Sequence, residues 1–491
     1  MIRLSKMLIC GLLLTPVGLL LGAAPDDTPR PVPVTRPEMK RLIEDVKIRT
    51  PRVPLPELSA EDREKLGTQA DSYESRLRFH YLKGVDDGRN GNPIGRGGQG
   101  GGAGRTGGGG RQGGGGQEQE PGMTLDNAFK VELFWIVSRV NNCQYCMGHQ
   151  ESKLLAAGLT EDQIAALDCD WSGFKPGEQV AFAFARKFSY EPHHLSDADI
   201  VELKKHFTDL QILEMILSMA GNNSINRWKE GVGVPQRKDE GGYSRVGRAD
   251  PTAPLDPTVA PKLPRGSYLT PTSAAFEKKV SKVAAIVVDA KTGEPTQATV
   301  CERAPLESRS EVEKILAQVR QRTSRLPLVG EAESRTIMGE KWTATGPLPN
   351  WVRLLANFPR SGGSRVASLR STDEKGDLTP LLKAQLSWII ARQDRAWYAV
   401  GQAQRWLRAL GQTDDQIYAL DGNWKEFTPR EQSLFTVARK LGASPVVLTD
   451  SEVNKAVELA GPRDVVQAIS YTTNRASFDR ITEAAGLQLE E

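Results

Sequence analysis

WIVSRVNNCQYCMGH, residues 135–149, is followed 253 residues later by WIIARQDRAWYAVGQ, residues 388–402. The likeness continues without a gap to residues 187 and 440, and 24 of the 53 aligned positions are identical. Among the differences, one group of chemically reactive residues is absent from the second copy, since Cys143, Cys146 and His149 face Ala396, Ala399 and Gln402. A duplicated scaffold that keeps its packing residues and loses one constellation suggests that the constellation serves chemistry.

Both copies have the sequence pattern of helices. Apolar residues recur at three- and four-residue steps through 125–140, which predicts an amphipathic helix. Thr160 with Gln163 forms a capping-box pattern that Thr413 and Gln416 repeat, while Gly158 is placed to end the preceding helix. Strand alternation is absent from both copies. The sequence therefore predicts an all-α fold of two tandem helical domains joined by a Pro-rich linker.

The chain of 491 residues is longer than one hydrophobic core usually serves. We expect a signal peptide or anchor at 1–24, a tether at 25–50, a first domain at 51–234, a connector at 235–305 and a second domain at 306–491. Arg52-Val53-Pro54-Leu55 resembles Arg325-Leu326-Pro327-Leu328 and marks where each repeat begins.

A glycine-rich insertion makes the first repeat longer than the second. Arg52 lies 91 residues before Cys143, whereas Arg325 lies 71 before Ala396, a difference of about 20 residues. The segment at about 87–120 accounts for it, because 95–116 holds fifteen glycines and cannot bury a core. Its three arginines lack interleaved aromatic residues, so we expect a disordered spacer and no nucleic-acid partner.

The N-terminus predicts export. Arg3 and Lys6 precede an apolar run over 7–21, and small residues follow at 22–24. The run is short for a membrane span of roughly 20 residues, so membrane contact is expected only if the segment stays uncleaved. The expected location is the periplasm or cell envelope, an oxidising space. The net charge of +3 points to no particular partner.

The number and spacing of the cysteines limit the roles that they can have. After the signal, the chain keeps Cys143, Cys146, Cys169 and Cys301, too few for a disulfide scaffold of this size. A Cys-x-x-Cys pair in an exported protein is a redox site, a metal half-site or a structural bridge. Zinc would need a fourth ligand beside Cys143, Cys146 and His149; His193 or His194 is a candidate, and no second spaced pair supports this reading.

Cysteines three residues apart share a helix face. Asn141 and Asn142 are plausible caps for a helix that starts at Cys143, and a helix N-terminus lowers a thiol pKa. His149 follows Cys146 by three residues and is placed to take a thiol proton, with Glu132 orienting the ring. A low-pKa thiolate beside a resolving thiol suits peroxide reduction, in which a sulfenate forms and condenses to a disulfide.

These residues resemble the AhpD-like, carboxymuconolactone decarboxylase family. The resemblance is carried by Glu132, Cys143-Gln-Tyr-Cys146, His149 and the run Gly158 to Ile164. It covers about 124–234, and 378–487 as a copy without the cysteines. It implies all-helical domains that assemble into homo-oligomers and reduce hydroperoxides with an external reductant and no cofactor beyond the dithiol. By resemblance, Cys146 attacks the peroxide, Cys143 resolves the intermediate, and His149 with Glu132 relays protons.

Two spacings depart from the family pattern, and one of them is the spacing from Glu132 to Cys143, which is one residue shorter here. The family places three residues between the second cysteine and the histidine, and here two separate Cys146 from His149. The ring is thereby moved by about 100° around an ideal helix. Two alternatives to a peroxidase stay open: a non-enzymatic scaffold with a static disulfide, and a decarboxylase-like activity on a small acid. The decarboxylase branch generally lacks the cysteine pair, which argues against the second alternative.

Overall fold

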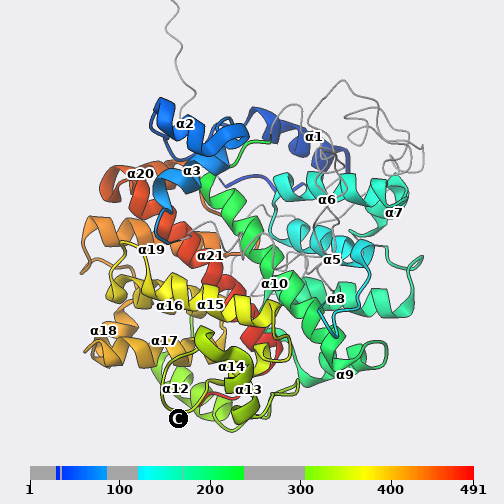
Figure 1. The fold of residues 1–491 in the computed structure, drawn as a ribbon, viewed down its shortest axis with the longest axis vertical. Coiled ribbons are helices and arrows are strands. Elements are labelled where there is room, and N and C mark those ends of the chain that lie inside the picture. Colours follow the sequence, from blue (N-terminus) through cyan, green and yellow to red (C-terminus); the bar gives the residue numbers. More distant parts are fainter. Residues whose placement is uncertain (1–28, 34–35, 86–119, 169, 237–304, 491) are drawn as a thin grey trace, which may run out of the picture.

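The computed structural model describes residues 29–33, 36–85, 120–168, 170–236 and 305–490 (Figure 1). These residues form nineteen α-helices and several short 3-10 turns, and no strand occurs among them. The predicted all-α fold class is confirmed. None of the helices in these ranges has the length and apolar character needed to cross a bilayer.

Six helices of the first repeat return in the second. They are α5 (Asn127–Val140), α6 (Gln144–Ala156), α7 (Glu161–Ala166), α8 (Pro176–Tyr190), α9 (Asp197–Lys204) and α10 (Asp209–Val232). Their counterparts are α16 (Pro380–Asp394), α17 (Trp397–Ala409), α18 (Asp414–Ala419), α19 (Pro429–Gly442), α20 (Asp450–Ala460) and α21 (Pro462–Ala484). Every pair starts 253 residues apart, the same offset that aligns the sequences.

The segments before these helices contain α1 (Arg36–Asp45), α2 (Ala60–Leu66) and α3 (Tyr73–Tyr81) in the first half. The second half has α12 (Arg309–Val319), α13 (Glu331–Met338), α14 (Asn350–Leu355) and α15 (Ser361–Glu374). The first residues of α1 and α12 lie 273 residues apart, as do Arg52 and Arg325. The similarity of the two halves therefore begins before Arg52, earlier than the sequence comparison indicated.

The local signals behave as predicted. Thr160 and Gln163 cap α7 reciprocally, and Thr413 and Gln416 do the same for α18. Gly158 follows α6 with a φ of 96°, a conformation that glycine adopts without a Cβ penalty. These caps satisfy backbone N–H and C=O groups that a helix leaves unpaired at its ends.

The expected tether is wrong over 36–48, where the chain forms α1 and a 3-10 turn. Met39 and Ile43 of α1 are fully buried, and Arg36 and Lys40 are buried as well. The Lys40 ammonium lies 2.6 Å from the Glu151 carboxylate of α6 and 3.0 Å from that of Glu161. In sequence this segment looks solvated because of its charges; in the fold, buried carboxylates supply the opposite charge.

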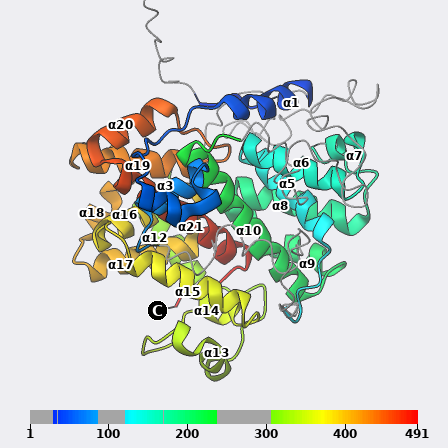
Figure 2. The ribbon, with the colours of Figure 1, turned by 45° about the horizontal axis from the view of Figure 1, so that its top comes forward.

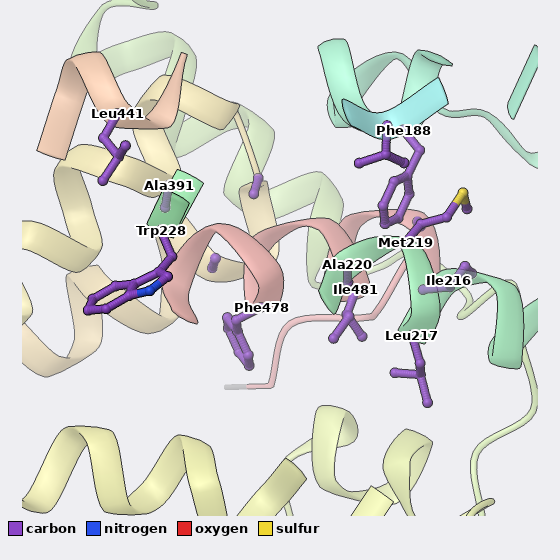
Figure 3. Close-up of a cluster of buried hydrophobic side chains, with 14 of the residues drawn as sticks. Phe188, Ile216, Leu217, Met219, Ala220, Trp228, Ala391, Leu441, Phe478 and Ile481 are labelled. Carbon is purple, nitrogen blue, oxygen red and sulfur yellow. The ribbon is translucent and has the colours of Figure 1, made fainter. Parts of the chain in front are cut away.

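The two halves share one hydrophobic core. Helices α10 and α21 pack against each other through the middle of the molecule, with α5–α9 on one side and α16–α19 on the other (Figures 1 and 2). Figure 3 shows side chains of α10 and α21, among them Met219 and Ile481, beside Phe188 of α8 and Leu441 of α19. Because each long helix buries its face against the other repeat, neither repeat completes its core alone.

The contacts between the halves follow an approximate twofold symmetry. Arg52 donates to the carbonyl oxygens of Glu230 and Leu448 and pairs with Asp450 at 2.5 Å. Arg325 makes the equivalent set, to Glu483, Leu195 and Asp197. Each of these partners lies 253 residues from its counterpart. Such an exchange, in which each half gives the other the same contact, is the pattern of an isologous dimer interface.

Several sequence-based expectations lie outside the described residues. They are the signal or anchor at 1–24, most of the glycine-rich segment, most of the connector, and Cys169 and Cys301. Those expectations stay predictions. The described part of the chain contains both cysteines of the pair.

Candidate functional site

The cysteine pair lies at the start of α6. Cys143 is the residue before the helix, Cys146 lies in its first turn, and both are thiols. Their sulfur atoms are 2.8 Å apart, which is longer than a disulfide bond of about 2.05 Å. Cys143 is fully buried and Cys146 is 2% exposed. A small movement would therefore join the two sulfur atoms.

The expected capping role of the asparagines is wrong. Asn141 ends α5, and its side-chain amide donates to Asn223 and Asn226 of α10 at 2.9 and 3.0 Å. Asn142 has a φ of 58° and donates to the carbonyl oxygens of residues 30 and 31. The left-handed conformation turns the chain sharply between α5 and α6. The asparagines thus form the turn, and Cys143 itself precedes α6.

A carboxylate of α10 lies beside Cys143. Burial raises the pKa of the Cys143 thiol well above its usual value, and the neighbouring Cys146 and the Glu230 carboxylate raise it further. Burial also disfavours the Glu230 carboxylate, but Arg49, at 3.2 Å, and two further arginines outweigh it and lower the pKa of Glu230. The expected low-pKa thiol is therefore not Cys143, which stays protonated.

A cation of the same helix lies near Cys146. The Lys229 ammonium is 4.4 Å from the centre of the Tyr145 ring and pairs with Glu74 of α3. Burial disfavours the ammonium, but Glu74, Tyr145 and Cys146 together raise the pKa of Lys229 above its usual value. The Trp228 indole N–H donates to Glu74 at 2.6 Å and holds that carboxylate in place. A permanent positive charge is thus available to a Cys146 thiolate.

His149 lies one turn along α6 from Cys146, half-buried. Its ring meets Tyr145 edge-on, with 4.6 Å between ring centres, and its Nδ1 is 3.5 Å from the Gln236 amide nitrogen. The histidine therefore belongs to the same cluster of side chains as the cysteine pair, with Tyr145 between it and Lys229. Its catalytic role stays a prediction.

Glu132 is not brought to the pair. Burial raises the pKa of Glu132 to about 7, Glu178 and Asp126 raise it further, and Lys175 opposes them. These charges lie at the starts of α5 and α8, whereas the cysteines follow the end of α5, some eight residues or about 12 Å beyond Glu132. The Glu132 carboxylate forms no hydrogen bond with His149 or with either thiol. The expected relay through Glu132 therefore stays a prediction.

We predict that Glu132→Gln changes stability and leaves thiol chemistry intact. Because the folded pKa of about 7 exceeds the usual 4.5, the folded chain binds a proton that the unfolded chain releases. Stability should therefore fall as pH rises from about 4.5 to about 7, by roughly 3 kcal/mol at most. Urea unfolding at pH 5 and pH 8 should show this fall in the wild type and lose it in the variant, which has the glutamine found at Gln385 of the second copy. A slower reaction with peroxide in the variant would instead support the relay.

The candidate zinc ligands of the sequence analysis do not form one group in the structure. Among the described residues, one group of side chains has metal-like spacing: Glu191, His193 and His194, whose ligand atoms lie within 4.8 Å of one another. They surround the 3-10 turn Pro192–His194 after α8, and His194 pairs with Glu191 at 2.8 Å. His193 and His194 thus lie beside each other and are not grouped with the cysteine pair.

Sequence reasoning missed Lys229, Glu230 and Glu74. The duplication held a signal for the first of them, because Lys229 aligns with Thr482 and so changes together with the cysteines. The alignment held no such signal for Glu230, because the second copy has a glutamate, Glu483, at the same position. No protein-family model matches this chain, and a search of curated proteins finds no match either.

Proposed function

We propose that the protein is an exported, thiol-dependent peroxidase or dithiol oxidoreductase, built from two tandem AhpD-like repeats of which the first carries the active dithiol. The observation that supports this most is the pair of buried thiols 2.8 Å apart, with the Lys229 cation at Cys146 and the Glu230 carboxylate at Cys143. The environments differ in sign, which suits one attacking and one resolving cysteine.

In the proposed reaction, the Cys146 thiolate attacks one peroxide oxygen and the O–O bond breaks. Cys146 becomes a sulfenic acid, and the leaving alkoxide takes a proton and departs as an alcohol, or as water from hydrogen peroxide. The Cys143 sulfur then attacks the sulfenic sulfur, the S–O bond breaks, and the Cys143 proton leaves with the hydroxide as water. The product is a Cys143–Cys146 disulfide, which an external dithiol reduces.

The surrounding residues have distinct proposed roles. Lys229 stabilises the negative charge on the Cys146 sulfur during attack, because a nearby positive charge attracts it. Glu230 lies where it can accept the Cys143 proton during resolution. His149, half-buried and near the pair, is the candidate for exchanging protons with solvent.

Burial limits the substrate. The backbone of residues 30–31 accepts hydrogen bonds from Asn142, and Ile43 of α1 packs so close to Gly148 that a Cβ there would lie 2.9 Å from it. The N-terminal segment therefore covers the start of α6. A small hydroperoxide is the expected oxidant, and a protein reductant requires this segment to move.

The second repeat is proposed as a partner of the first in assembly. The twofold-related contacts of Arg52 and Arg325 already make the chain resemble a dimer. Further copies would then close a homo-oligomer, as the family resemblance implies. The physiological reductant and periplasmic location belong to the same proposal.

A static disulfide is the second candidate, and the near-complete burial of both sulfur atoms favours it. A structural bridge and a turnover site differ in rate. A bridge forms once and reacts no faster with peroxide than free cysteine does.

The deciding experiment follows oxidation of the reduced protein by hydrogen peroxide and by an alkyl hydroperoxide in a stopped-flow instrument. We expect the wild type to form the disulfide rapidly, Cys146→Ser to be inert, and Cys143→Ser to stop at a sulfenic acid that a dimedone probe traps. A wild-type rate equal to that of free cysteine would overturn the peroxidase and leave the bridge.

A further inference from the structure

The second repeat contains a cavity at the place that matches the dithiol of the first. Its volume is about 350 Å³, and its lining includes Ala399 and Gln402, the counterparts of Cys146 and His149. The second repeat thus has open space at the position where the first repeat has Cys146 and His149. A cavity of this size fits the range of small-molecule sites.

Aromatic side chains form much of the wall: Trp342, Trp351, Trp406 and Phe478. Trp351 lies edge-on to both Trp342 and Phe478, with 5.6 Å between ring centres in each case. Since rings already held by one another lose little freedom on binding, they offer a preformed surface for a flat molecule.

The two arginines of the lining already have carboxylate partners. Arg475 pairs with Asp373 and donates to the Tyr471 hydroxyl at 3.2 Å. Arg370 is bound to Glu374 at 2.8 Å. An anionic ligand would have to compete with these carboxylates, so the lining disfavours one.

Asp479 is the group of the lining that stays unsatisfied. It is 1% exposed, and neither oxygen of its carboxyl group has a hydrogen-bond partner. Burial raises its pKa well above the usual value, as does Asp394, while Arg480, Arg475 and Arg227 oppose them. Buried polar groups in folded proteins are almost always hydrogen-bonded, so an orphaned carboxyl on a cavity wall points to a ligand.

We propose that the second repeat binds a flat aromatic amine in this cavity, with the ligand N–H donating to Asp479 and the ring lying against the tryptophans. The amine of such a ligand would donate an N–H to the unpaired oxygens of Asp479. Its aromatic ring would pack against the indole rings, which also attract a cation. The first repeat has Asn226 at the position of Asp479, and there it donates to Ser138 at 3.1 Å. The site thus belongs to the second copy and does not depend on the dithiol chemistry.

Tryptamine is the probe for calorimetric titration of the full chain, with indole and indole-3-acetate as neutral and anionic comparisons. We expect one-to-one binding of tryptamine with a change in tryptophan fluorescence, weaker binding of indole, and none of the acetate. Asp479→Asn should weaken tryptamine binding at least about tenfold, since the ligand amine loses the carboxyl group that it would pair with in the bound state. Asp415→Asn, which removes an exposed carboxylate from the same repeat, should bind as the wild type does.

One further variant and a test of folding make the result decisive. Ala403→Phe fills the cavity from α17 and should abolish binding of tryptamine and indole alike, while circular dichroism reports whether each variant is folded. Failure of tryptamine to bind the wild type, or equal affinity in folded Asp479→Asn, would overturn the proposal. Tighter binding of indole-3-acetate would do so as well. None of these outcomes bears on the peroxide reaction, which Cys146→Ser tests separately.

Discussion

Arg480→Met is expected to destabilise the folded chain by about 3–5 kcal/mol, because it leaves the Asp394 carboxylate buried without its counter-charge. Both side chains are fully buried and lie 2.6 Å apart. Arg480 also donates to the Ser189 carbonyl oxygen of the other repeat at 3.0 Å. Guanidinium unfolding followed by circular dichroism measures the loss as a lower midpoint.

The molecule supplies a matched control in Arg227, which occupies the same position in the first repeat. Where Arg480 pairs with Asp394, Arg227 donates to the neutral amide oxygen of Asn141 at 3.1 Å. It also donates to the Gly442 carbonyl and the Ser444 hydroxyl at 3.1 and 2.7 Å. Arg227→Met should therefore lower the free energy of unfolding by less, about 1–3 kcal/mol. Arg480→Met combined with Asp394→Asn should recover part of the loss. Equal losses in the two single variants would show that the ion pair adds nothing beyond hydrogen bonding.

Lys229→Met should slow the reaction of Cys146 with peroxide about tenfold or more, and slow its alkylation by iodoacetamide at pH 7 as much. The variant removes a buried positive charge beside the attacking sulfur, and a tenfold slower reaction corresponds to about 1.4 kcal/mol of lost stabilisation. Mass spectrometry after timed alkylation assigns the reacting cysteine. The single variant also removes one of the two cations that pair with the partly buried Glu74, the other being Arg78, so its stability is expected to fall too.

The double variant Lys229→Met/Glu74→Gln separates the two effects. It removes both charges of the pair, so stability should recover while the thiol stays slow. Full recovery of the Cys146 rate in the double variant would show that Lys229 acts on the fold and not on the thiol. Thr482→Met, at the matching position of the second copy, should leave the rate unchanged.

The fold class followed from local patterns alone. Caps such as Thr160 with Gln163, and the glycine after α6, act within a few residues, so sequence reveals them directly. The duplication located every paired helix, because its 253-residue offset holds for α5 to α10. Segment 36–48 was misread since its arginine and lysine look solvated until the carboxylates of α6 and α7 are placed beside them.

The sequence by itself determined the all-helical class, the repeat, and a cysteine pair within one helical turn. It could not place Lys229 and Glu230, more than eighty residues further along the chain, against those thiols. Nor could it show that Glu132 faces α8 and that Asp479 borders a cavity. The reason is physical: capping and periodicity depend on neighbours in the chain, whereas the charge around a buried group depends on which helices pack against it.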